Sequence, residues 1–180
     1  MTNTSLRIRK LLLTALFAAL TALGAFLRVP VPVLHSSFTL QVFFTCMAGL
    51  LLGPWCGAAS QGVYVLLGLV GVPIFTEGGG LTYLAKPTFG FLLGLIPMAL
   101  VIGLLTRREK CGFWRMVLAC IAGLAVLYAV GLPYMYFALN GAWSVGKTLV
   151  SGCAVFLPFD ALKIALACLL GGRLQRILRR

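Results

Sequence analysis

The sequence has little charge and very few acids. Of its 180 residues 10% are charged, only three are acidic (Glu77, Glu109 and Asp160), and there is a single histidine, His35. So small a set of titratable side chains offers little material for general acid–base catalysis or for a metal cluster. We therefore expect no enzymatic activity, no metal site and no cofactor. A membrane-embedded enzyme that uses His35 or Asp160 remains the alternative from another functional class.

Paired cysteines are also lacking. The six cysteines (Cys46, Cys56, Cys111, Cys120, Cys153 and Cys168) lie apart in apolar sequence, and none forms a Cys-x-x-Cys pair. This spacing argues against both a disulfide framework and a zinc site. We interpret these cysteines as small buried hydrophobic side chains.

Long apolar runs dominate what is present. Hydrophobic residues make up 61% of the chain, and the mean hydropathy is +1.06, which is typical of a protein whose solvent is lipid. A helix needs roughly 20 apolar residues to cross a bilayer. We predict an all-α, polytopic membrane protein that forms one domain over residues 1–180. Its six spans are expected at 11–28, 38–53, 55–75, 87–106, 114–138 and 150–172.

The net charge of +12 follows this topology and does not indicate nucleic-acid binding. Eleven of the fifteen cations fall in the N-terminus, the loop near 107–115 or the C-terminus, which share one side of a six-span chain: Arg7, Arg9, Lys10, Arg107, Arg108, Lys110, Arg115, Arg173, Arg176, Arg179 and Arg180. The opposite loops hold only Arg28, Lys86 and Lys147. The positive-inside rule therefore places both termini in the cytoplasm.

Asp160 is the acid that needs an explanation, because it lies within the last apolar run. An ionised side chain inside a span costs at least ~2.5–3.5 kcal/mol unless it is paired or hydrated. Lys163 follows three residues later, on the same helical face, and Pro158 suits the first turn of a helix, where a carboxylate is favoured. We predict that Asp160 and Lys163 form an ion pair in the outer part of the bundle and contribute to a solute pocket.

Two further patterns lead to different expectations. Residues 141–148, Gly-Ala-Trp-Ser-Val-Gly-Lys-Thr, match the phosphate-loop pattern, but they follow an apolar span and face outward, so we expect no ATP binding. Small residues recur at a spacing of four in the first span, where Ala15 pairs with Ala19 and Ala18 with Ala22. Such pairs let helices approach closely in lipid.

Several ordered segments give the chain a family resemblance. They are Phe-Thr-Leu-Gln at 38–41, Ala-Gly-Leu-Leu-Leu-Gly-Pro at 48–54, Gly-Leu-Val-Gly-Val-Pro-Ile-Phe at 68–75, Pro-Thr-Phe-Gly-Phe-Leu-Leu-Gly at 87–94 and Phe-Leu-Pro-Phe-Asp-Ala-Leu-Lys at 156–163. Over nearly its whole length the chain resembles the BioY family, the biotin-specific substrate-binding (S) components of energy-coupling-factor (ECF) transporters. It departs from the family pattern at Lys86–Gly90, where members often have Gly-Pro-Thr-Gly-Gly.

The resemblance implies a six-helix S-component fold in a prokaryotic plasma membrane, which captures biotin as a transported ligand. The implied partners are a membrane coupling protein and two cytoplasmic ATPases. Asp160 and Lys163 are the implied ligand-binding residues, and either Ala15 and Ala19 or Ala18 and Ala22 form the surface for the coupling protein. Another vitamin as the ligand, and a purely structural scaffold, are the remaining alternatives.

Biotin combines a polar ureido ring, an apolar bicycle and a terminal carboxylate, so its pocket must be mixed. We expect Asp160 to accept from the ureido N–H groups and Lys163 to donate to a ligand oxygen, with Gln41 and Thr39 as further polar contacts. Tyr64, Phe75 and Tyr83 are expected to line the apolar part. The ligand carboxylate is expected near Lys86 and the backbone N–H groups of the glycine run Gly78, Gly79 and Gly80.

Overall fold

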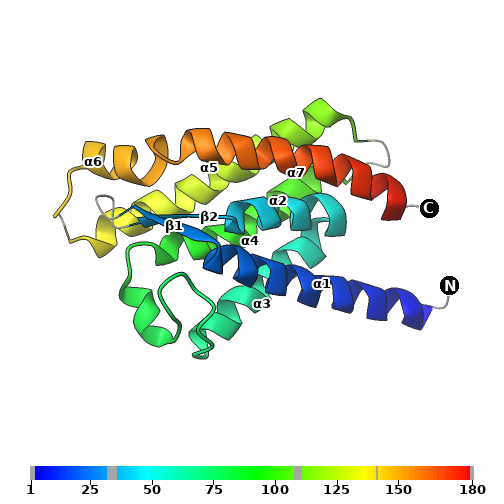
Figure 1. Cartoon of the computed structure of the whole chain (residues 1–180), viewed down its shortest axis with the longest axis horizontal. Coiled ribbons are helices and arrows are strands. Elements are labelled where there is room, and N and C mark those ends of the chain that lie inside the picture. The colour runs from blue at the N-terminus through cyan, green and yellow to red at the C-terminus, as the bar shows by residue number, and fades with distance from the viewer. Residues whose placement is uncertain (1–2, 32–35, 108–110, 141, 179–180) are drawn as a thin grey trace.

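Helices build almost the whole molecule. The structure is a computed structural model, and it describes residues 3–31, 36–107, 111–140 and 142–178. Its six main helices are α1 (Asn3–Phe26), α2 (Gln41–Leu52), α3 (Pro54–Leu69), α4 (Phe89–Leu105), α5 (Phe113–Ala138) and α7 (Leu157–Leu178). They pack side by side as one bundle, with both chain termini at the same end (Figure 1). The predicted all-α bundle is confirmed.

The helices differ in length more than the apolar runs suggested. Three helical stretches within the described residues are long and apolar enough to cross a membrane: Thr4–Phe26, Phe113–Ala138 and Val145–Gln175. Helix α2 has only 12 residues, or about 18 Å at 1.5 Å per residue, against a hydrocarbon core of about 30 Å. This agrees with the short second run in the sequence.

A small hairpin that the sequence analysis did not anticipate joins α1 to α2. Strands β1 (Arg28–Val31) and β2 (Ser36–Thr39) are antiparallel, and Arg28 pairs with Thr39. The backbone N–H of Leu40 donates to the carbonyl oxygen of Gly24 at 3.0 Å, which fixes the start of α2 against the end of α1. His35 lies outside the described residues, so its predicted alternative role has no structural description.

The third apolar run, expected to be helical through residue 75, turns earlier. Helix α3 ends at Leu69, and Gly71 adopts a positive φ of 114°, which stops the helix. The remaining apolar residues fold back over the bundle, where Phe75 is 1% exposed and packs against Tyr64. The chain then continues through a short 3-10 helix, η2 (Leu81–Ala85), into α4.

The last helical stretch is divided by a π-helical turn. Helix α6 (Val145–Leu149) passes into the π-helix η3 (Val150–Ala154), where the N–H of Val155 donates to the carbonyl oxygen of Val150. Helix α7 then starts at Leu157, and Asp160 lies in its first turn, as predicted from Pro158. The π-helical turn therefore directly precedes the residues of the predicted pocket.

Small residues allow close packing inside the bundle. In α4, a methyl group at Gly90 would lie 2.3 Å from Tyr134, and one at Gly94 would lie 2.9 Å from Leu127, both on α5. In α1, Ala18 and Ala22 are buried at 4% and 9% exposure, whereas Ala15 and Ala19 are exposed. Only the Ala15–Ala19 pair is therefore open to another protein.

Candidate functional site

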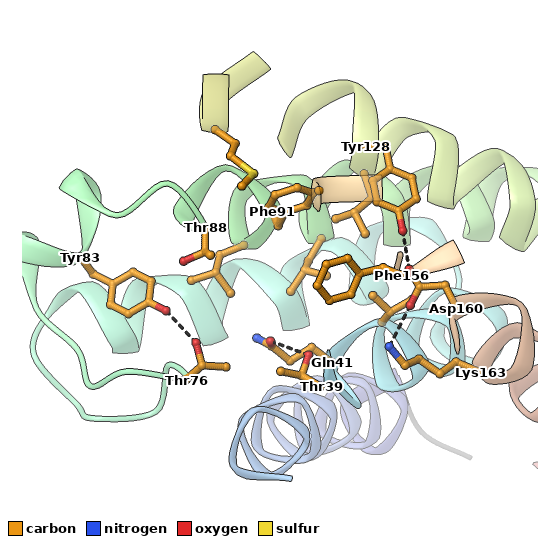
Figure 2. Close-up of a pocket in the computed structure, with 16 residues that line it drawn as sticks. Thr39, Gln41, Thr76, Tyr83, Thr88, Phe91, Tyr128, Phe156, Asp160 and Lys163 are labelled. Carbon is orange, nitrogen blue, oxygen red and sulfur yellow. Dashed lines mark hydrogen bonds and ion pairs between the residues drawn. The ribbon is translucent and has the colours of Figure 1, made fainter. Parts of the chain in front are cut away.

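A cavity lies among the helices beside the predicted ion pair (Figure 2). Its walls come from the β2–α2 junction, the segment before α4, and helices α4, α5 and α7, together with Gly152 of the π-helical turn. The cavity volume is about 100 Å³, several times the ~10–15 Å³ that one water molecule needs on the same measure. Its lining residues are Thr39, Gln41, Val42, Thr76, Tyr83, Thr88, Phe91, Leu92, Leu95, Leu127, Tyr128, Met135, Gly152, Phe156, Asp160 and Lys163.

One end of the cavity holds the charged pair of α7. Lys163 Nζ lies 2.8 Å from Asp160 Oδ1, and the residues are only 8% and 3% exposed. The predicted i, i+3 pairing is therefore confirmed. The second carboxylate oxygen, Asp160 Oδ2, accepts a hydrogen bond of 2.6 Å from the hydroxyl of Tyr128 on α5. Each carboxylate oxygen thus has a partner, and the pair is neutral overall, which reduces the cost of burying it.

A chain of hydrogen bonds from β2 through α2 to α3 borders the cavity. The Thr39 hydroxyl donates to Gln41 Oε1 at 3.0 Å, and Gln41 Nε2 donates to the Tyr64 hydroxyl at 2.8 Å. Tyr64 in turn donates to the carbonyl oxygen of Ile74 at 3.2 Å. Thr39 and Gln41 line the cavity, as expected, whereas Tyr64 lies behind Gln41 and fixes its orientation.

The opposite end of the cavity is lined by hydroxyl groups. The Tyr83 and Thr76 hydroxyls lie 2.8 Å apart, and Thr88 stands beside them at the start of α4 (Figure 2). Arg28 of β1 donates to the carbonyl oxygen of Thr76 and so ties the hairpin to this segment. In Figure 2, Phe91, Phe156, Gln41 and Thr39 lie between this polar end and Asp160.

Lys86 lies outside the cavity lining and pairs with Glu77. Both side chains are close to half exposed. The hydrogen bond that Lys86 donates to the Glu77 carboxylate raises the pKa of Lys86 above its ordinary value, so Lys86 stays protonated throughout the physiological range. Lys86 lies in the segment between α3 and α4, and its charge is therefore already partly neutralised by Glu77.

The glycine run is built into the fold more tightly than the sequence suggested. The backbone N–H of Gly78 donates to the carbonyl oxygen of Phe75 and that of Gly80 to the carbonyl oxygen of Gly68, so both groups already have backbone acceptors. A methyl group at Gly79 would lie 2.3 Å from the carbonyl oxygen of Val72. These glycines do not line the cavity, and their roles as ligand contacts stay predictions.

Aromatic side chains close the middle of the cavity. Phe156 lines it and packs against Phe38 of β2 with ring centroids 4.7 Å apart, and Phe38 also contacts Phe159 at 4.2 Å. Phe91 of α4 meets the Tyr128 ring edge-on at 6.3 Å. Phe75, expected in the lining, instead supports it from behind through Tyr83, with centroids 4.7 Å apart.

Tyr128 is the most important lining residue that sequence reasoning missed. It lies 32 positions before Asp160 and belongs to another helix. A usable signal was present, because a phenol within an apolar span needs a hydrogen-bond partner. The sequence alone names no such partner. Among the described residues, no group of three or more His, Cys, Asp or Glu side chains is arranged to hold a metal ion.

Apolar helices that enclose a cavity with a buried charge pair define a helical membrane protein with a solute-binding site. Comparison with known proteins narrows this class. The sequence matches the BioY family over residues 1–180, and the chain belongs to that family.

Two relatives and one solved structure illustrate the match. The chain is 43% identical to the probable biotin transporter BioY of Lysinibacillus sphaericus, covering 94% of this chain and 88% of the relative. It is 36% identical to the biotin transporter BioY of Thermotoga maritima, covering 94% and 97%. The crystal structure of the S-component for biotin from an ECF-type ABC transporter superposes with a TM-score of 0.86 at 25% identity, covering 100% of this chain and 95% of that one.

Proposed function

We propose that this protein captures biotin and imports it as the S component of an ECF transporter. The observation that carries the proposal is the cavity itself, which has the charged pair at one end and hydroxyl groups at the other, with aromatic and aliphatic side chains, Thr39 and Gln41 along the wall between them. Biotin has the same order of chemistry, with a ureido group, an apolar bicycle and chain, and a carboxylate. Membership of the BioY family, whose named relatives are biotin transporters, supports the same ligand.

The ureido group fits the end that holds Asp160. A carboxylate has about four lone-pair sites, and Lys163 and Tyr128 occupy only two of them. Asp160 therefore retains acceptors for a ligand N–H, while Lys163 retains protons for a ligand carbonyl. Gln41 and Thr39 lie along the cavity wall and supply further polar contacts.

The ligand carboxylate then lies toward the hydroxyl-lined end. Thr76, Tyr83 and Thr88 offer hydroxyl donors there, and Lys86 adds positive charge at the neighbouring outer segment. The glycine run supports this end by holding the segment against α3, since the N–H of Gly80 bonds to Gly68 at 2.7 Å.

The bundle orientation follows from charge. The chain termini, the end of α4 and the start of α5 lie at one end of the bundle (Figure 1), and most of the cations in the sequence are in or beside these segments. We assign that end to the cytoplasm of a prokaryotic cell, which makes the opposite end, with the segment between α3 and α4, the outer one. Biotin then enters the cavity from the outer face of the plasma membrane.

Import against a gradient needs an energy source. We assign it to two cytoplasmic ATPases that act through a membrane coupling protein. The exposed Ala15–Ala19 face of α1 is the contact for that coupling protein, because small side chains allow another helix to approach closely. Ala18 and Ala22 belong to the core and are not part of this surface.

Equilibrium binding to the detergent-purified protein tests the proposal. The wild type is expected to bind biotin, to reject riboflavin and thiamine, and to lose affinity on Asp160→Asn. Trp55→Phe is a matched control, because Trp55 is 72% exposed and lies outside the cavity lining. Tight binding of another vitamin in place of biotin would replace the ligand, and no binding by folded wild type would refute the proposal.

A further inference from the structure

The ring of Phe91 rests directly on a glycine of the neighbouring helix. Phe91 extends from α4 and lines the cavity, whereas Gly131 of α5 is buried and lies outside the lining. A methyl group at Gly131 would lie 2.4 Å from Phe91 Cδ1 and 2.6 Å from Cε1. Because non-bonded carbon atoms pack at about 3.5–4.0 Å, the ring keeps this position only while residue 131 has no side chain.

The surroundings of the ring determine where it would move. Tyr128, also on α5, meets the ring edge-on with centroids 6.3 Å apart. At Gly152 of the π-helical turn, a methyl group would lie 3.6 Å from Phe91 Cζ, so this backbone also stands close to the ring. Both residues line the cavity together with Phe91, as Figure 2 shows for Tyr128. Since protein interiors are otherwise close-packed, a ring displaced from Gly131 moves into the cavity.

We propose that Gly131 is a positioning residue that sets the width of the cavity through Phe91 and so determines ligand specificity. With glycine at position 131, the middle of the cavity accepts a urea ring fused to a second ring, as in biotin. With a larger residue there, the displaced Phe91 ring leaves room only for the single urea ring of desthiobiotin, which lacks the thioether bridge. This inference rests on the proposed function, because it assumes that the bicycle of biotin lies between the two polar ends.

A role in helix packing alone makes a different prediction. If Gly131 only lets α4 and α5 approach closely, Gly131→Ala loosens the bundle and weakens both ligands by a similar factor. If it positions Phe91, the loss falls mainly on the wider ligand, and it disappears once the Phe91 ring is removed. The ratio of the two affinities and its dependence on Phe91 therefore separate the two roles.

The experiment measures equilibrium binding of biotin and desthiobiotin by the detergent-purified full-length protein. Gly131→Ala is expected to weaken biotin at least about tenfold, as overpacking does in a filled site, and desthiobiotin by no more than about threefold. In the Phe91→Leu background, adding Gly131→Ala should change biotin affinity by less than about threefold, because the smaller side chain leaves room for the methyl group.

Gly123→Ala is the matched control on the same helix. Its methyl group would lie 2.6 Å from Ile102 of α4, and neither residue lines the cavity. The overpacking is therefore similar to that at Gly131, but it leaves Phe91 in place. The ratio of biotin to desthiobiotin affinity should stay at its wild-type value.

Three results in these variants overturn the inference. They are an equal loss of affinity for both ligands in Gly131→Ala, no loss of biotin affinity in that variant, and a loss that persists in the Phe91→Leu background. If wild type does not bind biotin, the proposed function itself fails, and this inference fails with it. Any of the three results in a protein whose wild type binds biotin leaves the proposed function intact.

Phe91→Leu alone decides the matter if Gly131→Ala does not fold. Wild type should bind biotin sulfone, whose ring sulfur carries two oxygens, more weakly than biotin, because the Phe91 ring leaves no room for them. Phe91→Leu should reduce that penalty at least about threefold. Equal binding of the sulfone and biotin by wild type, or an unchanged penalty in Phe91→Leu, overturns the inference.

Discussion

Removing one member of the Asp160–Lys163 pair should destabilise the protein more than removing both. The pair is nearly inaccessible, with side-chain exposures of 5% for Asp160 and 10% for Lys163. Lys163→Met leaves the Asp160 carboxylate with only the Tyr128 hydroxyl as a hydrogen-bond partner. The double variant Asp160→Asn with Lys163→Met removes both charges and keeps side chains of similar size.

The expected magnitude follows from the energetics of buried ion pairs. Breaking such a pair by removing one partner costs roughly 3–5 kcal/mol, whereas replacing both partners is often neutral. The remaining bond from Tyr128 favours the lower figure, about 3 kcal/mol. At about 2–4 °C per kcal/mol for a chain of this size, Lys163→Met should lower the Tm by roughly 6–12 °C. The double variant should stay within about 2 °C of wild type.

Thermal unfolding of the purified proteins in detergent, without ligand, provides the assay. Lys86→Met is the matched control, because its pair with Glu77 is exposed and contributes little to stability. Biotin binding by the double variant is measured in parallel and should be lost although stability is restored. A double variant as unstable as Lys163→Met would refute the electrostatic reasoning, and wild-type affinity in the double variant would remove the pair from the ligand site.

Three further changes test other parts of the molecule. Gly79→Ala should lower the Tm and weaken biotin binding, because its methyl group would clash with a carbonyl oxygen 2.3 Å away, whereas Gly62→Ala has open space and should do neither. Gln61→Leu should lower the free energy of unfolding by about 1–3 kcal/mol, because it leaves the buried Thr45 hydroxyl, which donates to Gln61, without its acceptor. Unchanged stability in a denaturation experiment would contradict this. Ala19→Leu should weaken co-purification with the coupling protein while biotin binding persists, but Ala18→Leu should destabilise the bundle itself.

The sequence predicted the features that depend on short-range pattern. The long helices α1 and α5 follow from uninterrupted apolar runs, and the Asp160–Lys163 pair follows from a spacing of three on one helix. Pro158 correctly indicated the start of α7. Each of these depends on residues that are close together in the chain, where spacing determines geometry.

The features that the sequence left open depend on tertiary contact. The hydrogen bond between Tyr128 and Asp160 joins two helices through residues that are 32 positions apart in the chain. The packing of Phe75 against Tyr64, after α3 has ended at Leu69, is likewise a tertiary contact. A local signal distinguishes the two alanine pairs of α1. Thr21 is fully buried, and a polar residue in an apolar helix favours the bundle interior, which places neighbouring Ala18 and Ala22 inward.

The π-helical turn at Val150–Ala154 has a consequence for how the pocket could change over evolution. A π turn contains one residue more than an α turn, and each residue of an α-helix advances the direction of its side chains by about 100°. Loss or gain of a single residue there would rotate α7 relative to α6 and carry Asp160 and Lys163 away from the cavity together. One short insertion or deletion is therefore a route by which a lineage could abandon one ligand without replacing Asp160 or Lys163.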